Sequence, residues 1–287
     1  MYRKDTTPVD ASDPYSEEML AREVTDHPSK LQASVINTIS SFRFSELWDV
    51  NEVKPPEEVV VPVKKPNRVI PVVVYHGIRK TKDSESKALK EFNVSPEIFE
   101  QQLVYITTAG YTPMTIHQLV ESEKMGTVPA KPVLLTFDDG WKNQYTNALP
   151  LLVKYNVPAT FYIFTDAVGA KNFFSWNDVF AIDKAGMEIA CHSVTHPMLT
   201  KLDPIKAFQE MEQCRMILEK RLGKPITDFA YPYGDYNHDI MTLTKNAGYD
   251  TGRTSNKSKY NSLSDLFTIN ALDAHDDLEE FKKMIAE

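Results

Sequence analysis

Cysteine is scarce in this chain, because only Cys191 and Cys214 occur among 287 residues. The two share no metal-binding or redox spacing, and two cysteines do not make a disulfide framework. Long apolar runs are also missing, since the longest, residues 69–75, is far shorter than a membrane span. No basic block appears and the net charge is −8, which argues against nucleic acid or an anionic membrane as the partner.

The length suits one large domain, or one domain with an extension. Residues 1–13 are polar and lack the apolar core of a secretory signal. Residues 51–67 mix prolines with charges, which is typical of a linker. We therefore expect residues 1–67 to be an irregular, partly helical N-terminal extension, a spacer from a cell surface, and residues 68–287 to be the main domain.

From residue 68 onward, segments of strand pattern and helix pattern alternate along the chain. The expected strands cover residues 69–75, 133–137, 159–164, 187–191, 228–231 and 267–272. The expected helices cover residues 95–110, 115–125, 143–155, 175–186, 205–222 and 237–247, with a last helix from residue 278. Repeated strand-then-helix units of this length predict a parallel α/β fold, either an open sheet or a barrel.

The strand over residues 133–137 ends in two carboxylates and a glycine, Asp138, Asp139 and Gly140. Neighbouring side chains on a regular strand point to opposite faces. At a strand end, where Gly140 permits a sharp turn, both carboxylates can converge on one pocket. Adjacent carboxylates repel each other unless a cation or a proton lies between them. The pair therefore predicts a positive partner, at the end of the strand where α/β folds build their chemistry.

A histidine pair offers such a partner. His192 and His196 are four residues apart, which places both imidazoles on one face if the segment is a helical turn. With a carboxylate from a distant strand they make three ligands, the set typical of a catalytic zinc site with an open position. The alternative is two surface histidines, or one satisfied core histidine. The Asp138-Asp139 pair favours the metal site.

These motifs resemble those of a known family. Residues 136–140 (Thr-Phe-Asp-Asp-Gly), 192–196 (His-Ser-Val-Thr-His) and 231–234 (Tyr-Pro-Tyr-Gly) resemble the three principal motifs of the polysaccharide deacetylases, carbohydrate esterase family four. The resemblance extends over residues 68–287. It implies an α/β fold, a distorted (β/α) barrel of about seven parallel strands. It also implies a hydrolase that removes N-acetyl groups from N-acetylglucosamine residues of a polysaccharide, outside the cell or at its surface.

One branch of the family is the best match. Tyr75-His76 on the first strand, and the lack of a clear C-terminal Leu-x-His motif, resemble the poly-N-acetylglucosamine deacetylases. In that branch the strand order is permuted and the acid histidine comes early in the chain. Peptidoglycan and chitin-type glycans remain alternative substrates.

The resemblance also implies a role for each motif residue. Asp139, His192 and His196 are the expected ligands of a divalent metal, most simply Zn²⁺. Asp138 is the expected general base on the metal-bound water that attacks the acetamide.

The remaining roles concern the oxyanion and the leaving amine. The backbone N–H of Tyr233 is expected to stabilise the oxyanion, and His76 is expected to protonate the amine. His275, just past the last strand, is the second candidate for the acid. Its acidic surroundings are typical of a solvated turn, so His76 is preferred.

One position departs from the family pattern. Many members carry an arginine two residues before the proline of the third motif, where it holds the base; here that residue is Ala230. Arg253, expected on the loop after Tyr249, is the candidate replacement and is included among the substrate-binding residues. Cys191 should point away from the site as a packing residue.

Aromatic residues beside the motifs are candidates for stacking on sugar rings. Trp141 and Tyr233 adjoin the first and third motifs and are the preferred substrate-binding residues, whereas most aromatics of an α/β domain are core. The other candidates are Tyr145, Trp176 and Tyr236.

Two other functions compete with the deacetylase. A metal-free, inactive carbohydrate-binding module on the same fold is disfavoured by the complete set of Asp138, Asp139, His192 and His196. A glycosidase needs two carboxyls roughly 5 to 10 Å apart on opposite sides of the scissile bond. Sequence neighbours reach that separation with difficulty, and the histidines are then unexplained.

Overall fold

The computed structural model describes residues 68–286, so the predicted extension over residues 1–67 lies outside the described residues. The strands of the main sheet are β2 (Val72–Tyr75), β5 (Thr112–Pro113), β6 (Pro132–Phe137), β7 (Thr160–Ile163), β8 (Glu188–Cys191), β9 (Asp228–Ala230), β10 (Thr251–Lys257) and β12 (Ile269–Asp273). Two small sheets stand apart from it, one of β1 (Arg68–Val69) with β11 (Tyr260–Asn261) and one of β3 (Gly77–Ile78) with β4 (Asn93–Val94).

Seven of these strands close into a parallel barrel. Their order is β2, β12, β10, β9, β8, β7 and β6, and β2 pairs again with β6. β5 pairs with the first residues of β6 as an additional strand. The predicted barrel of about seven parallel strands is therefore confirmed, and the open sheet is excluded.

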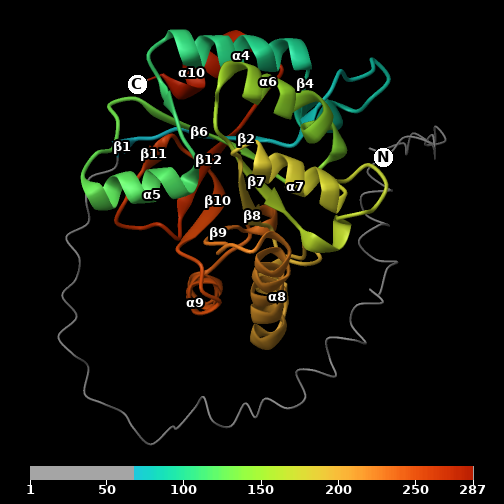
Figure 1. Cartoon of the computed structure of the whole chain (residues 1–287), viewed down its shortest axis with the longest axis vertical. Coiled ribbons are helices and arrows are strands. Elements are labelled where there is room, and N and C mark those ends of the chain that lie inside the picture. Colours follow the sequence, from blue (N-terminus) through green and yellow to red (C-terminus); the bar gives the residue numbers. More distant parts are fainter. Residues whose placement is uncertain (1–67, 287) are drawn as a thin grey trace, which may run out of the picture. The chain divides into compact units, whose positions relative to one another are not determined.

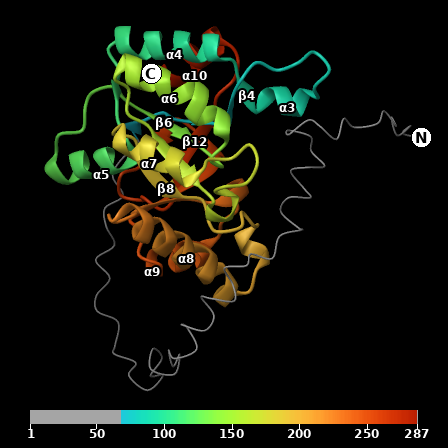
Figure 2. The ribbon, with the colours of Figure 1, turned by 45° about the vertical axis from the view of Figure 1, so that its right-hand side comes forward.

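Helices surround the barrel (Figure 1). They are α3 (Lys87–Glu91), α4 (Pro96–Thr108), α5 (Ile116–Met125), α6 (Leu149–Tyr155), α7 (Trp176–Lys184), α8 (Pro204–Leu222), α9 (His238–Asn246) and α10 (Leu278–Ile285). α4, α6 and α10 lie together on one side, and α8 and α9 lie together on another (Figures 1 and 2). Among residues 68–286, no helix combines the length and the apolar character needed to cross a membrane.

Capping residues fix several of the predicted helix ends. The Ser95 hydroxyl accepts a hydrogen bond from the Ile98 N–H, and Pro96 occupies the first turn of α4. The Asp203 carboxylate caps α8 in the same way, and Gly223 ends that helix with a left-handed φ of 69°.

Three local predictions need correction. The first strand is split into β1 and β2, because Pro71, which lies between them in the sequence, has no N–H to donate to a neighbouring strand. The helix expected over residues 143–155 begins as a π-helical turn, Gln144–Ala148, before α6. The loop predicted to carry Arg253 is instead strand β10. The sequence of β10 is polar and does not show a strand pattern. The segment becomes a strand because the barrel places it between β9 and β12, with which it pairs.

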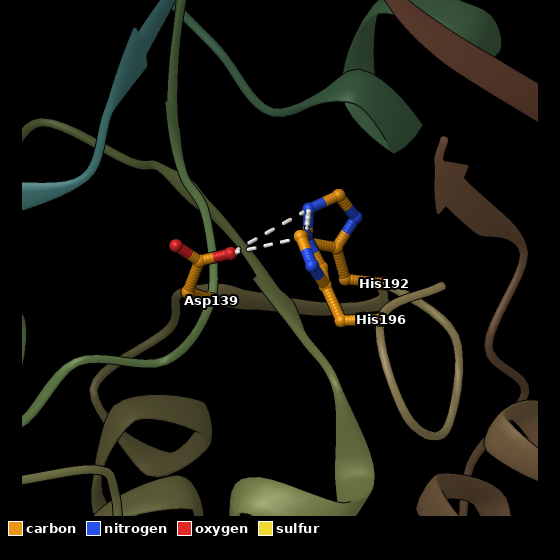
Figure 3. Close-up of side chains that lie close together, drawn as sticks. All are labelled: Asp139, His192 and His196. Carbon is orange, nitrogen blue, oxygen red and sulfur yellow. Dashed lines mark hydrogen bonds and ion pairs between the residues drawn. The ribbon is translucent and has the colours of Figure 1, made fainter. Parts of the chain in front are cut away.

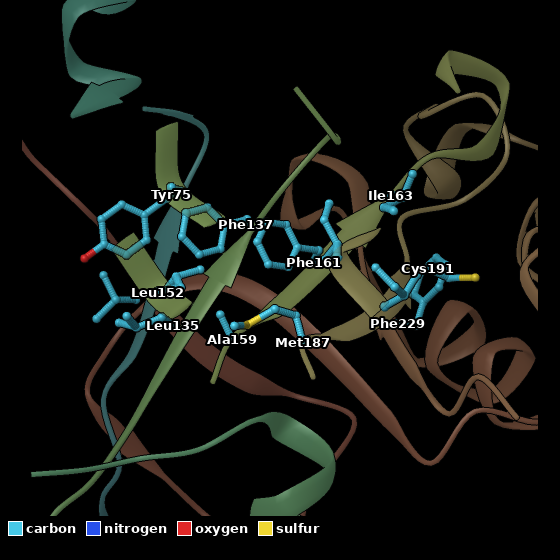
Figure 4. Close-up of a cluster of buried hydrophobic side chains, with 14 of the residues drawn as sticks. Tyr75, Leu135, Phe137, Leu152, Ala159, Phe161, Ile163, Met187, Cys191 and Phe229 are labelled. Atoms are coloured by element: carbon cyan, nitrogen blue, oxygen red, sulfur yellow. The ribbon is translucent and has the colours of Figure 1, made fainter. Parts of the chain in front are cut away.

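Alternate residues of the barrel strands face two different environments. On the outside, Tyr75, Phe137 and Phe161 stack in a row beneath the helices, with ring centroids 5.2 and 4.7 Å apart (Figure 4). Cys191 belongs to this same layer, as a buried packing residue. A second buried cluster includes Tyr162 and Ala230. Period-2 alternation thus gives each strand one face towards the helices and one towards the second cluster.

Candidate metal centre and active site

The two aspartates follow β6, where the backbone makes a left-handed turn. The Asp138 N–H still donates to Tyr75 O at 2.9 Å, as a continuation of the sheet. Asp139 and Gly140 then have φ values of 73° and 82°. The left-handed φ of Gly140 favours glycine, and a Cβ there would lie 3.2 Å from the Phe174 ring, a tight contact. The turn brings neighbouring carboxylates to one site, as the sequence predicted.

Asp139, His192 and His196 converge on one point (Figure 3). One potential ligand atom from each residue lies within 4.8 Å of the others. Asp139 Oδ1 is 3.7 Å from His192 Nε2 and 3.5 Å from His196 Nε2, and the two nitrogens are 3.2 Å apart. A carboxylate oxygen and two imidazole nitrogens in this arrangement fit the donor set of a catalytic zinc site.

The histidines lie on a loop, not on the helical turn that their spacing suggested. Ser193 and His196 adopt left-handed φ values of 67° and 59°. The Ser193 hydroxyl accepts a hydrogen bond from the His196 N–H at 2.9 Å. Glu210 of α8 binds the loop through the Val194 N–H, the Thr195 N–H and the Thr195 hydroxyl, at 2.8 to 2.9 Å. This irregular loop therefore brings the two imidazoles together, as one helical turn would have done.

A backbone carbonyl orients His192. Its Nδ1 lies 2.8 Å from Ala230 O, an acceptor, so Nδ1 carries the proton and Nε2 presents its lone pair to the cluster. Burial lowers the pKa of His192 well below its ordinary value, and the nearby His196 acts in the same direction. Burial likewise lowers the pKa of His196. Both imidazoles are thus kept neutral, the form that binds a metal.

Arg253 holds Asp138 from the adjacent strand. In the parallel pairing of β9 with β10, Arg253 is the partner of Ala230, the position where the family carries an arginine. The Arg253 guanidinium donates from Nη2 to Asp138 Oδ2, and both side chains are buried. It also lies over the Tyr162 ring, 5.1 Å from the centroid. An arginine one strand away therefore reaches the same carboxylate.

The other oxygen of Asp138 is a buried acceptor. Within residues 68–286, Asp138 Oδ1 has no hydrogen-bond partner. Buried polar atoms are nearly always paired, so an unpartnered one marks a place where chemistry or a ligand supplies the partner. Gln144 fixes the strand ends around it, donating from Nε2 to His76 O and to Asp138 O. No local pattern in the sequence indicates the roles of Gln144 and Glu210.

Trp141 binds the metal-site carboxylate instead of presenting an open ring. Its indole Nε1–H donates to Asp139 Oδ2 at 2.9 Å. The ring stacks on Phe173 with centroids 4.3 Å apart, and Trp141 is only 7% exposed. Stacking of Trp141 on a sugar stays a prediction, while its bond to Asp139 is a feature that the sequence did not suggest.

The two candidate acids are in different environments. His76 follows β2 and packs edge-on against Phe92 at 4.8 Å. Burial lowers the pKa of His196 most; Asp139 and Asp138 raise it, and His76 is close enough to lower it. His275 instead lies 3.7 Å from Glu280, at the start of α10. The structure thus brings His76, and not His275, towards the histidine pair.

Tyr233 lies beside the histidines on the third motif. Its ring centroid is 4.6 Å from that of His196, and the residue is 59% exposed. Its φ of 58° is left-handed, which is strained for a tyrosine. At Gly234, a Cβ would lie 2.7 Å from Ser255 N of β10, so the turn presses closely on that strand.

Comparisons with known proteins agree with this site. Residues 125–252 match the family model for polysaccharide deacetylase. The poly-β-1,6-N-acetyl-D-glucosamine N-deacetylase of Staphylococcus aureus is 30% identical over 202 residues, which cover 62% of this chain and 69% of that protein.

Solved structures show the same fold. The Streptococcus pyogenes deacetylase PplD, in complex with acetate, superposes with a TM-score of 0.71 at 26% identity, covering 76% of this chain and 98% of that one. A polysaccharide deacetylase from Bacillus cereus gives a TM-score of 0.68 at 27% identity, covering 77% and 70%. The chain belongs to the polysaccharide deacetylase family, as the sequence motifs predicted, and is an enzyme of the carbohydrate esterase class.

Proposed function

We propose that this protein is a metal-dependent hydrolase that removes N-acetyl groups from N-acetylglucosamine residues of a polysaccharide. The observation that supports it is the convergence of Asp139, His192 and His196 beside Asp138, whose Oδ1 has no partner among the described residues. We assign the activity to residues 68–287 and treat residues 1–67 as an N-terminal extension.

The residues present fit a divalent metal, most simply Zn²⁺. Two neutral imidazoles and one carboxylate are the ligands that this ion takes when it keeps a position open for catalysis. Two of the three ligands are also held by a second group: His192 by Ala230 O, and Asp139 by the Trp141 indole. The bound ion would polarise the acetamide carbonyl and lower the pKa of a water molecule.

The side chains around it carry the proton transfers. Asp138 accepts the proton of the attacking water through Oδ1, while Arg253 holds Oδ2. The water oxygen adds to the acetamide carbonyl carbon, and the Tyr233 backbone N–H donates to the resulting oxyanion. His76 gives a proton to the nitrogen as the C–N bond breaks. The products are acetate and a glucosamine residue with a free amine.

We favour poly-N-acetylglucosamine as the polymer and the outside or surface of the cell as the location. Similarity to the staphylococcal enzyme, whose name gives a β-1,6-linked substrate, supports this choice over peptidoglycan or chitin-type glycans.

Acetate release from defined polymers tests the proposal. The purified chain is incubated with β-1,6- and β-1,4-linked N-acetylglucosamine oligomers and with peptidoglycan, before and after removal of metal by a chelator and after restoration with Zn²⁺. We expect release from the β-1,6 polymer that the chelator abolishes and Zn²⁺ restores. Substoichiometric metal together with no release from any polymer would indicate a carbohydrate-binding module instead.

A further inference from the structure

Two exposed aromatic rings flank the histidines of the site. Tyr233 contacts His196 and is 59% exposed, and Phe92 contacts His76 and is 52% exposed. Single exposed apolar residues are ordinary on protein surfaces. A pair that each packs against a histidine of the same site is a more specific arrangement, and Phe92 has no role in the chemistry described above.

The backbone places Phe92 firmly beside His76. Phe92 ends α3, on an excursion from the barrel wall that includes β4 (Figure 2). Its carbonyl accepts a hydrogen bond from the N–H of Gly77, the residue after His76, at 3.0 Å. β3 and β4 then pair in parallel, from Gly77 with Asn93 onward. The chain therefore holds an exposed phenyl ring next to the candidate acid.

Gly77 makes this close approach possible. A Cβ at that position would lie 1.9 Å from Asn93 Oδ1, so the Asn93 side chain would have to shift. The Asn93 amide in turn donates to Leu89 O at 2.7 Å and so ties α3 to β4. The short excursion is thus packed against the end of β2, where His76 lies.

We propose that Phe92 is a sugar-stacking residue that binds a pyranose neighbouring the one whose acetamide is cleaved. The C–H face of a hexosamine ring is apolar. Stacking it on an exposed phenyl ring removes apolar surface of both rings from water, which favours binding. The inference rests on the proposed function. Phe92 and Tyr233 contact different histidines of the site, so the two rings offer contacts to different sugars of one polymer.

Oligosaccharide kinetics separate this subsite from the chemistry. The variant Phe92→Ala is compared with wild type on a β-1,6-linked N-acetylglucosamine hexamer and on 4-nitrophenyl acetate, which carries no sugar. We expect kcat/KM on the hexamer to fall about tenfold, chiefly through KM, and to fall about tenfold more than on the ester. Phe92→Tyr, which keeps the ring, should restore the hexamer value.

Tyr260→Ala is the matched control, because it removes another exposed aromatic ring. Tyr260 pairs with β1, which precedes β2, so it lies at the opposite end of the barrel from His76. Equal losses on hexamer and ester would overturn the proposal, since the effect of the ring would then not depend on the sugar. An unchanged KM for the hexamer would overturn it as well.

A binding measurement keeps this test independent of the proposed reaction. The hexamer is titrated calorimetrically into Asp138→Asn and into Asp138→Asn with Phe92→Ala. Weaker binding in the double variant supports the subsite even if wild type releases no acetate from any glycan, an outcome that counts against the proposed function alone. Equal affinity of the two variants for the hexamer overturns the subsite.

Discussion

The indole of Trp141 donates a hydrogen bond to one oxygen of Asp139, and the other oxygen of that carboxylate faces both histidines. Trp141 Nε1 lies 2.9 Å from Oδ2, while Oδ1 is 3.5 Å from His196 Nε2. The turn at Asp139 and Gly140 brings the indole back onto the carboxylate two residues earlier. The indole beside the first motif therefore orients a carboxylate within it, and that carboxylate presents a single oxygen to the imidazoles.

Replacing the indole should weaken the metal site itself. In Trp141→Phe the ring can still stack on Phe173, but the donor to Asp139 is lost. We expect Zn²⁺ affinity, measured by competition with a chelator, to fall about 10- to 100-fold, as for other groups that orient metal ligands. Trp176→Phe, on α7 beneath the Arg221 guanidinium, is the control and should bind Zn²⁺ as wild type does. Unaltered affinity in Trp141→Phe would remove this role.

The two neighbouring aspartates should separate into a base and a ligand. Asp138→Asn is expected to lower kcat by about 100-fold or more while Zn²⁺ binding remains near stoichiometric. Asp139→Asn and His192→Ala should instead lose bound metal on dialysis, because each removes a ligand. Metal content and acetate release are measured on the same preparations. Full activity in Asp138→Asn would contradict the base assignment.

Loss of the acid should depend on the leaving group. His76→Ala should reduce turnover of acetamides far more than turnover of an activated acetate ester, whose leaving group needs no proton; about 100-fold is expected for the amide. His275→Ala serves as the control, since His275 lies towards Glu280. If His76→Ala lowers the turnover of both substrates equally, or if His275→Ala shows the selective loss on the amide instead, the assignment to His76 is wrong.

The ion pair between Arg253 and Asp138 should matter for stability as well as for activity. Arg253→Met leaves a buried carboxylate without its cation, and we expect the free energy of unfolding in urea to fall by about 3 to 5 kcal/mol. Adding Asp138→Asn removes that charge and should restore part of the loss. Lys154→Met breaks an exposed pair with Glu100 and should leave the free energy of unfolding nearly unchanged. If the effects of Arg253→Met and Asp138→Asn on the free energy of unfolding were additive, the two side chains would not be coupled.

Stability should also respond to an acid pair at the other end of the barrel, formed by buried Asp228 and partly buried Glu188. Burial, together with the Glu188 carboxyl, raises the pKa of Asp228 well above its ordinary value. The folded state then binds this proton more tightly than the unfolded chain. The contribution of Asp228 is fully present below about pH 4 and is lost as the pH rises through the folded-state pKa.

Asp228→Asn removes this dependence. We expect its free energy of unfolding, relative to wild type, to improve by about 1 kcal/mol or more between pH 5 and pH 8, measured by urea titration. Asp250→Asn, at an exposed carboxyl, should show no such trend. A difference between Asp228→Asn and wild type that stays constant with pH would contradict the raised pKa.

Local patterns were enough to predict a parallel α/β fold and most of its strand ends, whereas the choice of a barrel came from the family resemblance. The buried β6 run, the capped helices and the glycine after Asp139 each carry their information within a few residues, because capping and turn geometry are local. The same alternation placed Cys191 outward among the packing residues. β10 was missed because its sequence is polar and its strand character comes from two neighbouring ladders.

Local sequence thus predicts which residues offer imidazole nitrogens and carboxylate oxygens, and at which strand end they lie. Their partners depend on the closed sheet. Arg253 reaches Asp138 across 115 residues of sequence, and Glu210 reaches the histidine loop from a separate helix. Such contacts follow from strand order and register, which are set by the packing of the whole barrel. For that reason the folded protein, and not any one segment, determines which side chain holds the base and which ring stands beside the acid.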